Sequence, residues 1–332
     1  MASLGHSIGL FVFLLAAPLA NSNSVQAELL MSEYRGTCDA SAAVSIGNNH
    51  FIVANDEDNN LRVYRLGYPD PVKSFNLDSF AKVDPENPEL DIEAAARIGD
   101  RIYWITSHGA NKNAKFRPGR RRLLATEFSF KNGKPKVTTI GFTYAGLLDD
   151  ISVSAQLKKY RLDAAAQIAP KDEGGLNIEG LAETPGGALL IGFRNPILSG
   201  NALLVTINNP GDVIQGKRPV IGPVLELPLG GLGIRSIERD GDSYIIIAGP
   251  YDNNGKFRLF RWQGPSGRGK LIPILTVDFK ELHPEALFIS SQGHVHILSD
   301  DGAREINGVN CKDSFLKENR FRTMNIKLEN TR

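Results

Sequence analysis

The sequence predicts an all-β protein, a five-bladed β-propeller with one helical lid insertion. Three observations support this prediction. A short hairpin pattern recurs five times, glycine makes up 33 of the 332 residues, and the many apolar runs are short and rich in β-branched residues. The chain has 38 Lys and Arg against 37 Asp and Glu, with 42% hydrophobic residues. This balance is typical of a globular protein and argues against a nucleic-acid partner.

The repeated unit is a strand, a tight turn that contains glycine, and a second strand of β-branched or aromatic residues. The five copies occupy residues 39–54, 91–105, 177–191, 233–247 and 283–298. Their equivalent positions, which lie 52, 86, 56 and 50 residues apart, are Ser41, Glu93, Glu179, Arg235 and Glu285. Two more strands follow most copies, for example at 61–64 and 73–77 after the first. Each unit therefore forms a four-stranded blade, since propeller repeats span about 40 to 50 residues.

The interval of 86 residues is long because it contains an insertion at about 143–175. Within it, residues 152–168 have the Ala, Leu, Lys and Gln content of a helix. The insertion joins two blades at one rim of the channel, where we expect it to act as a lid. A sixth, degenerate blade is the alternative. Residues 29–36 are expected to add the outer strand of the last blade, so that 28–332 close into a single domain.

The N-terminus has the features of an export signal. The first 27 residues contain no Asp, Glu, Lys or Arg, residues 8–20 are apolar, and residues 25–27 fit the small-x-small cleavage rule. We therefore expect a signal peptide over 1–27 and a periplasmic or secreted monomer that makes no contact with the membrane after cleavage; an uncleaved anchor is the alternative. In such an oxidising compartment Cys38 and Cys311 are expected to form a disulfide that ties the two ends together.

One rim of the propeller is expected to gather acidic side chains. The strands of each hairpin are antiparallel, so the starts of the first strands and the ends of the second strands meet at the rim opposite the turns. Inner strands alternate in side-chain direction, so Asp91 and Glu93, or Asn177 and Glu179, point the same way. Like charges at close range need compensation. Either Arg235 neutralises them in a structural network, or a hard cation, with Ca²⁺ preferred, occupies the channel.

These considerations give two sets of candidate residues. The expected catalytic residues are Glu93, Glu179, Glu285 and Arg235. The expected metal ligands are Asp39, Asp91, Asn177 and Asp56.

A basic segment lies at the same rim. Residues 112–122 contain six Lys and Arg side chains. We expect either a solvated surface loop or a site for an anion such as a phosphate ester, for which Arg offers paired hydrogen-bond donors. Other polar side chains end the second strands of the blades. The expected ligand-binding residues are Arg194, Asn195, His108, Lys115, Arg117 and Asp252.

Several strings in the chain resemble a family of exported bacterial proteins that is known as a domain of unknown function. They are residues 39–44, 53–59, 61–64, 91–95, 177–182 and 191–196. More remotely, Ile178-Glu179-Gly180-Leu181 is similar to the first strands of phytase-like and esterase-like propellers and of the gluconolactonase group. That resemblance implies a divalent metal at the channel mouth and hydrolysis of phosphoesters or lactones. It carries over to Glu179, and by internal symmetry to Glu93 and Glu285.

The expected function is therefore that of an exported propeller that binds a divalent cation and an anionic small molecule at the channel mouth. In a metal-dependent phosphoester hydrolase the cation would polarise the phosphoryl oxygen, with one ring carboxylate as general base. Two alternatives remain. The propeller could bind a protein or glycan partner without catalysis, or it could be a hydrolase of the lactonase type.

Overall fold

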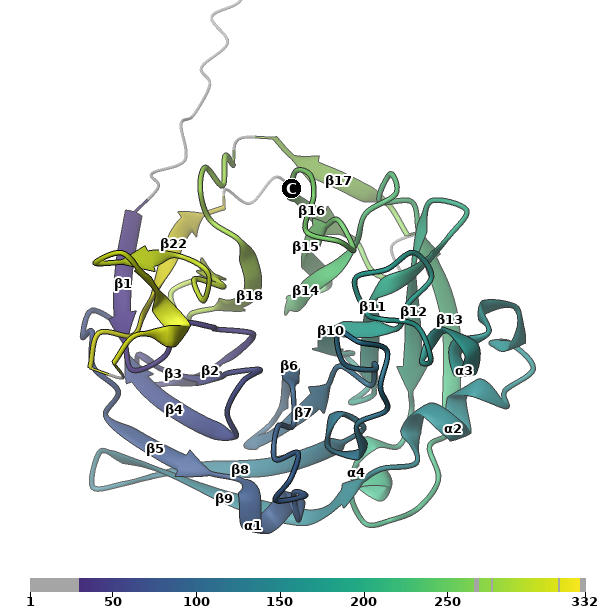
Figure 1. Ribbon diagram of the computed structural model, residues 1–332, viewed down its shortest axis with the longest axis horizontal. Helices are drawn as coiled ribbons and strands as arrows, with labels where there is room; N and C mark the ends of the chain where they lie inside the picture. The colour runs from purple at the N-terminus through teal and green to yellow at the C-terminus, as the bar shows by residue number, and fades with distance from the viewer. Residues whose placement is uncertain (1–29, 266–268, 276, 316, 329–332) are drawn as a thin grey trace, which may run out of the picture.

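A computed structural model describes residues 30–265, 269–275, 277–315 and 317–328. The predicted signal peptide at 1–27 lies outside these residues. Five four-stranded sheets radiate around a central axis (Figure 1). The predicted five-bladed propeller is therefore confirmed, and the described part of the chain contains no sixth blade. None of the helices in the described ranges has the length and apolar character needed to cross a membrane.

Each of the first four blades is a meander of consecutive antiparallel strands. Blade one contains β2 (Ala42–Gly47), β3 (His50–Ala54), β4 (Asn60–Arg65) and β5 (Lys73–Asn76). Blade two contains β6 (Ile92–Ile98), β7 (Arg101–Thr106), β8 (Leu123–Lys131) and β9 (Lys134–Tyr144). Blade three contains β10 (Asn177–Glu183), β11 (Leu189–Leu198), β12 (Asn201–Ile207) and β13 (Ile221–Leu227). Blade four contains β14 (Gly233–Asp240), β15 (Ser243–Gly249), β16 (Arg258–Trp262) and β17 (Leu271–Ile274).

Blade five is assembled from both ends of the chain. It contains β18 (Pro284–Ile289), β19 (His294–Ser299), β22 (Arg320–Lys327) and the N-terminal strand β1 (Leu30–Arg35). β1 pairs antiparallel with β22 as the outer strand. The ring is thus closed by the strand that the sequence predicted near residues 29–36.

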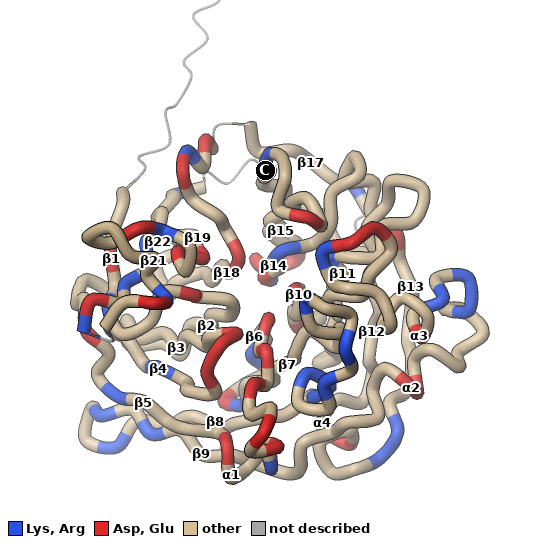
Figure 2. Tube along the Cα trace, in the orientation of Figure 1, with Lys and Arg blue, Asp and Glu red and all other residues tan. Residues whose placement is uncertain are grey.

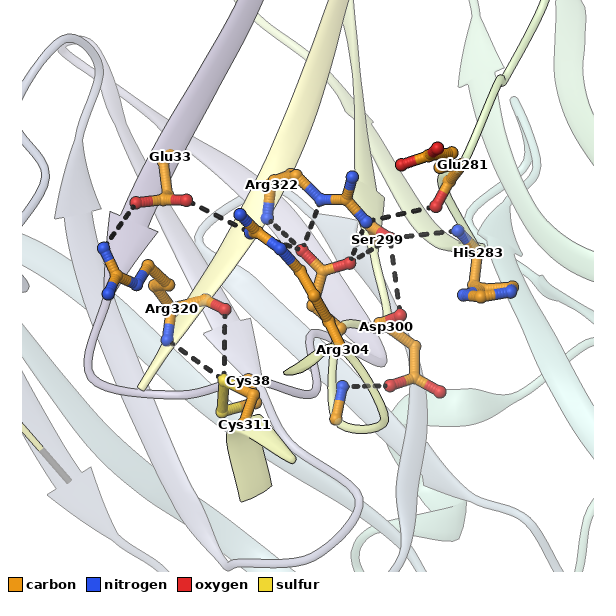
Figure 3. Close-up of polar contacts among 12 residues, drawn as sticks. Glu33, Cys38, Glu281, His283, Ser299, Asp300, Arg304, Cys311, Arg320 and Arg322 are labelled. Carbon is orange, nitrogen blue, oxygen red and sulfur yellow. Dashed lines mark hydrogen bonds and ion pairs between the residues drawn. A yellow bond between two sulfur atoms is a disulfide. The ribbon is translucent and has the colours of Figure 1, made fainter. Parts of the chain in front are cut away.

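Covalent and ionic contacts hold this closure (Figure 3). The predicted disulfide between Cys38 and Cys311 is present and joins residues 273 positions apart. Next to it, the carboxylate of Asp301 accepts hydrogen bonds of 2.9 and 2.7 Å from Nε and Nη2 of Arg322. Asp301 is fully buried, so this ion pair is shielded from solvent. The disulfide fixes the connection after β19 to the loop before β2, and the ion pair fixes the start of that connection to β22.

Short elements occupy the connections. They are α1 (Asp78–Ala81), η1 (Pro118–Arg120), α4 (Pro210–Val213), β20 (Glu305–Ile306), β21 (Val309–Asn310) and η3 (Cys311–Asp313). The predicted helical insertion is confirmed as α2 (Leu147–Ser152), η2 (Lys158–Tyr160) and α3 (Leu162–Ala165). Its side chains Leu148, Ile151 and Leu162 are buried in the core shared by blades two and three. Figure 1 places α2 and α3 at the perimeter beside β13, after which the chain returns towards β10.

Neighbouring blades pack through apolar faces that come very close near the axis. Gly180 on β10 and Gly192 on β11 lie under Ile234 of blade four, and a Cβ at either position would come within 2.8 Å of the Ile234 methyl group. Glycine is needed there because any side chain would push blades three and four apart. This close approach brings the inner strands, and the polar residues at their ends, around one narrow axis.

Candidate functional site

The inner strands bring three glutamates together at one end of the channel. Glu93 comes from β6, Glu179 from β10 and Glu285 from β18, and each is at least nine-tenths buried. Figure 2 shows Asp and Glu positions gathered around the central axis beside these strands. Burial raises the pKa of Glu93 well above its ordinary value, and the negative charges of Asp91, Glu179, Asp56 and Glu285 raise it further. The acidic residues of separate repeats therefore form one cluster.

Two of these glutamates are neutralised by arginine. Nε of Arg235 lies 3.0 Å from Oε2 of Glu179, and its Nη2 contacts Glu285. Nη1 of Arg194 lies 2.7 Å from Oε1 of Glu179. All four side chains are buried, so the Arg194–Glu179–Arg235–Glu285 network links blades three, four and five out of contact with bulk water. Of the two alternatives predicted from the sequence, neutralisation of the carboxylates by Arg235 is the one found for Glu179 and Glu285.

Asn253 completes this network and was missed in the sequence. Its Oδ1 accepts hydrogen bonds of 2.7 Å from Nη2 of Arg194 and 3.0 Å from Nη1 of Arg235. Asn253 has a φ of 67°, a left-handed conformation that asparagine tolerates better than most residues. The only signal was the polar run that follows β15. Arg194 and Arg235 are 1% exposed, and their guanidinium groups contact carboxylates and Asn253.

The remaining carboxylates of the mouth have fewer cationic partners. Glu93 has no hydrogen bond or ion pair among the described residues. Burial raises the pKa of Asp91 to about 7, although Nη1 of Arg120 lies 3.0 Å away. Burial and the charges of Asp300 and Asp91 raise the pKa of Asp56 to about 8. This side of the mouth therefore has more carboxylates than cations.

The other predicted ligand-binding residues lie in different settings. Nδ2 of Asn195 donates to the carbonyls of Pro170 and Asp172, at 3.1 and 2.8 Å, and so fastens the end of the insertion to blade three. His108 is fully buried, and burial lowers its pKa to about 4, which keeps the ring neutral. The structure thus gives Asn195 an anchoring role and encloses His108 in the protein interior.

Asp252 and the basic loop lie nearer to solvent. Oδ1 of Asp252 accepts the backbone N–H of Asn254 at 2.9 Å, which shapes the loop after β15. Lys115 is exposed and Arg117 is half-buried. Arg120 of the same basic segment, unlike Lys115 and Arg117, forms ion pairs with Glu89 and Asp91.

The four predicted metal ligands do not form a single shell. Asn177 donates to Oε1 of Glu179 at 2.8 Å, Asp91 pairs with Arg120, and Asp39 contacts Asp300, a residue not among the sequence candidates. In the described ranges, no group of three or more His, Cys, Asp or Glu side chains is arranged to hold a metal ion. The donor chemistry, carboxylate and amide oxygen, still suits a hard cation that takes several ligands from water.

The comparison with protein families gives one match. Residues 145–271 match the family model described as Protein of unknown function (DUF3616). The DUF3616 match confirms the predicted resemblance to a propeller family of unknown function. The matched stretch contains Glu179, Arg194, Arg235 and Asn253, the arginine-paired part of the mouth. A search of the curated proteins finds no match.

Solved structures share the general architecture at low sequence identity. A putative oxidoreductase (glucose dehydrogenase) from Thermus thermophilus is 12% identical, with 89% of this chain and 99% of that chain covered and a TM-score of 0.45. A catalytically inactive virginiamycin B lyase from Staphylococcus aureus is 11% identical, with coverage of 91% and 100% and a TM-score of 0.40. An engineered GH43 glycoside hydrolase is 12% identical, and the match covers 89% of this chain and 51% of that chain with a TM-score of 0.44.

Proposed function

We propose that the channel mouth binds a divalent cation beside Glu93, with Ca²⁺ as the preferred ion, and that the protein hydrolyses an anionic small molecule there, a phosphate ester. One observation carries this proposal. Glu93 is a buried carboxylate that lacks a partner among the described residues and faces four other carboxylates. Buried like charges destabilise a protein unless a cation compensates them. Arg235 compensates Glu179 and Glu285, whereas Glu93 is left for a cation from solution.

Two carboxylates would supply the protein donors for this cation, namely Glu93 and Asp56, because Asp91 is paired with Arg120. The charge of Asp56 raises the pKa of Glu93, which supports their proximity. Ca²⁺ takes six to eight oxygen ligands and commonly includes water, so the remaining positions would be filled by solvent and by the ligand. Asp39 is not included in this set because its carboxyl group contacts Asp300.

We propose that the basic loop at residues 111–117 binds the anionic group of the substrate. Lys112, Lys115 and Arg117 have no acidic partner among the described residues, since the ion pairs of this segment involve Arg120 and Arg121. The turn is ordered by Oδ1 of Asn111, which accepts the backbone N–H of Lys115 at 3.0 Å. Fixed cations without partners suit a phosphate group, which binds Lys and Arg through charge-assisted hydrogen bonds.

The chemistry of this site would divide between the ion and the chain. A bound cation would supply polarisation of the ester oxygen. Without the cation Glu93 would hold a proton, because burial and its acidic neighbours raise its pKa well above the ordinary value; binding of the cation would release that proton. The disulfide supports the proposal that the protein works in the periplasm or outside the cell, because such bridges persist in oxidising compartments.

Calorimetric titration of Ca²⁺ and Mg²⁺ into the purified protein at neutral pH tests the cation site. We expect Glu93→Gln to weaken binding at least about tenfold, since it removes the central charge. Glu86→Gln is the matched control, because Glu86 is exposed and makes no ion pair in the described structure. Absence of binding heat in the wild-type protein, or equal affinity in Glu93→Gln, would remove the cation from the proposal.

A non-catalytic propeller that binds a protein or glycan partner is the second candidate. The observation that favours it is the Arg194–Glu179–Arg235–Glu285 network, in which every charged group has a partner of opposite charge, as expected of a structural link between blades. Assays with 4-nitrophenyl phosphate and with δ-gluconolactone separate the candidates. Turnover of the first supports the phosphoesterase, turnover of the second supports the lactonase, and no turnover of either supports the partner-binding propeller.

A further inference from the structure

The last residues of the insertion pass over the mouth end of blade three. Asn177 and Asn195 are the paired residues at that end of β10 and β11, and the connection from α3 leads directly into Asn177. Nδ2 of Asn195 donates to the carbonyl oxygens of Pro170 and Asp172, at 3.1 and 2.8 Å. These two residues stand on either side of Lys171. A side chain that is only 1% exposed therefore holds the backbone of Lys171 at the mouth.

Backbone contacts fix the shape of residues 169–175. The N–H of Asp172 donates to the carbonyl of Ala169, and the N–H of Gly175 donates to the carbonyl of Asp172, each at 3.0 Å. A Cβ at Gly175 would lie 2.1 Å from the carbonyl oxygen of Ala169, so the close approach of the chain to itself requires glycine there. These turns give the backbone of Lys171 a defined position.

The same segment packs against the connection that carries the basic loop. A Cβ at Gly109 would lie 2.4 Å from the carbonyl oxygen of Leu176 and 3.6 Å from Cβ of Pro170, so a side chain at Gly109 would separate the two backbones. Gly109 stands two residues before the basic loop at 111–117. Lys171 and the basic loop therefore lie on adjacent segments of the same rim.

Lys171 is available to a ligand. Its side chain is exposed and forms no ion pair within the described residues, whereas Arg194 and Arg235 are buried against Glu179. Burial opposes the ionisation of Asp300 in blade five, but hydrogen bonds and the positive charges of Arg235 and Lys171 lower its pKa. The charge of Lys171 thus acts on a carboxylate from the far side of the mouth, as expected of a side chain that lies within range of a ligand bound there.

We propose that Lys171 binds the anionic group of the substrate together with the basic loop, an inference that rests on the proposed function. An ammonium group donates charge-assisted hydrogen bonds to phosphate oxygens. Lys171 would thereby select an anionic ester over a neutral lactone. Since it exchanges no proton or bond with the substrate, it should stabilise the bound substrate and the transition state alike, which changes KM and leaves kcat unchanged.

Steady-state kinetics with 4-nitrophenyl phosphate test this role. Lys171→Met should raise KM about tenfold or more and change kcat by less than about threefold, and Lys171→Arg should restore most of the affinity because it keeps the charge. Lys158→Met is the matched control, since Lys158 is an exposed lysine of the same insertion without an ion pair in the described structure, and it should change neither constant. An unchanged KM in Lys171→Met would overturn the assignment.

A second variant tests Asn195 as the positioning residue. Asn195→Ala removes both hydrogen bonds to the turn and should raise KM about threefold or more, because Lys171 is then less well placed. In the Lys171→Met background the same change should have no further effect on KM. An equal effect of Asn195→Ala in both backgrounds would show that Asn195 does not act through Lys171 and would overturn its positioning role.

A non-hydrolysable phosphate mimic separates failure of this inference from failure of the proposed function. If the wild-type protein turns over no phosphate ester, the hydrolase proposal fails, and Lys171 is tested by calorimetric titration of methylphosphonate in the presence of Ca²⁺. A Kd that rises about tenfold or more in Lys171→Met, and not in Lys158→Met, supports an anion site without catalysis. Equal Kd values in all three proteins, or no binding heat in the wild-type protein, would overturn the inference.

Discussion

Buried glutamates on the two sides of the channel mouth differ in whether they have an arginine partner. On the side of blades three to five, Glu179 and Glu285 are buried against Arg235, and Arg194 adds a second cation. On the side of blades one and two, Glu93 is just as deeply buried but has no such partner among the described residues. The repeats supply a carboxylate at equivalent positions, so the difference arises from where the arginines lie. The paired side joins three blades through ion pairs, and the unpaired side is the part of the mouth for which we propose a cation.

The largest effect is expected on the paired side. Arg235→Met leaves Glu179 and Glu285 without their shared cation in a buried setting, which should lower the free energy of unfolding by about 3–5 kcal/mol. Urea unfolding measures this loss. The double variant Arg235→Met with Glu285→Gln should be less destabilised than the sum of the single variants. Strict additivity would show that the ion pair is not what holds these blades.

Loss of the disulfide, which lies next to Asp39, should lower the free energy of unfolding. Replacing Cys38 and Cys311 by serine removes a bridge that spans 273 residues, with an expected loss of about 2–4 kcal/mol. Thermal unfolding of the variant, compared with that of the wild-type protein with and without reductant, gives the value. Equal melting temperatures in all three samples would show that β1 and the ion pairs of Asp301 suffice to close the ring.

Asn253→Ala is the next smaller change on the paired side. It removes the acceptor shared by Arg194 and Arg235, but Asn253 is exposed, so water can replace this acceptor and the expected loss is about 1.5 kcal/mol. Asn254→Ala is the control, because Asn254 is exposed and bonds only Asp252 within the described residues. A loss confined to Asn253→Ala supports its orienting role, whereas similar losses in both variants would assign the effect to the loop as a whole.

A pH dependence of stability is expected on the unpaired side. The pKa of Asp56 is about 8 in the folded protein, above its ordinary value, so the folded state holds a proton that the unfolded state releases between about pH 4 and 8. Stability should therefore fall as the pH rises through this range. Asp56→Asn should flatten this slope, which is measured as Tm against pH across the range. An unchanged slope would place the titration elsewhere.

The sequence predicted the blades better than it predicted the chemistry of the mouth. Strand alternation and hairpin geometry are local, so the convergence of Glu93, Glu179 and Glu285 followed from the repeats alone. The hydrogen-bond and ion-pair partners of these side chains, by contrast, come from distant parts of the sequence. Nothing in the sequence indicated that Asn253 would take a left-handed conformation and accept from both arginines, or that ring closure would press Asp300 against Asp39. Those contacts depend on how blades pack across the axis, to within about an ångström.

The same substitution made on each side of the mouth tests the central claim most directly. Glu179→Gln should destabilise the protein at pH 8 in chelator, since it leaves Arg194 and Arg235 short of a charge. Glu93→Gln should leave the protein as stable or more stable under these conditions, because it removes a carboxylate whose charge is opposed by burial and by its neighbours. Unfolding free energies that change in these opposite directions are the predicted result. Equal destabilisation by both variants would contradict the division of the mouth into a paired and an unpaired side.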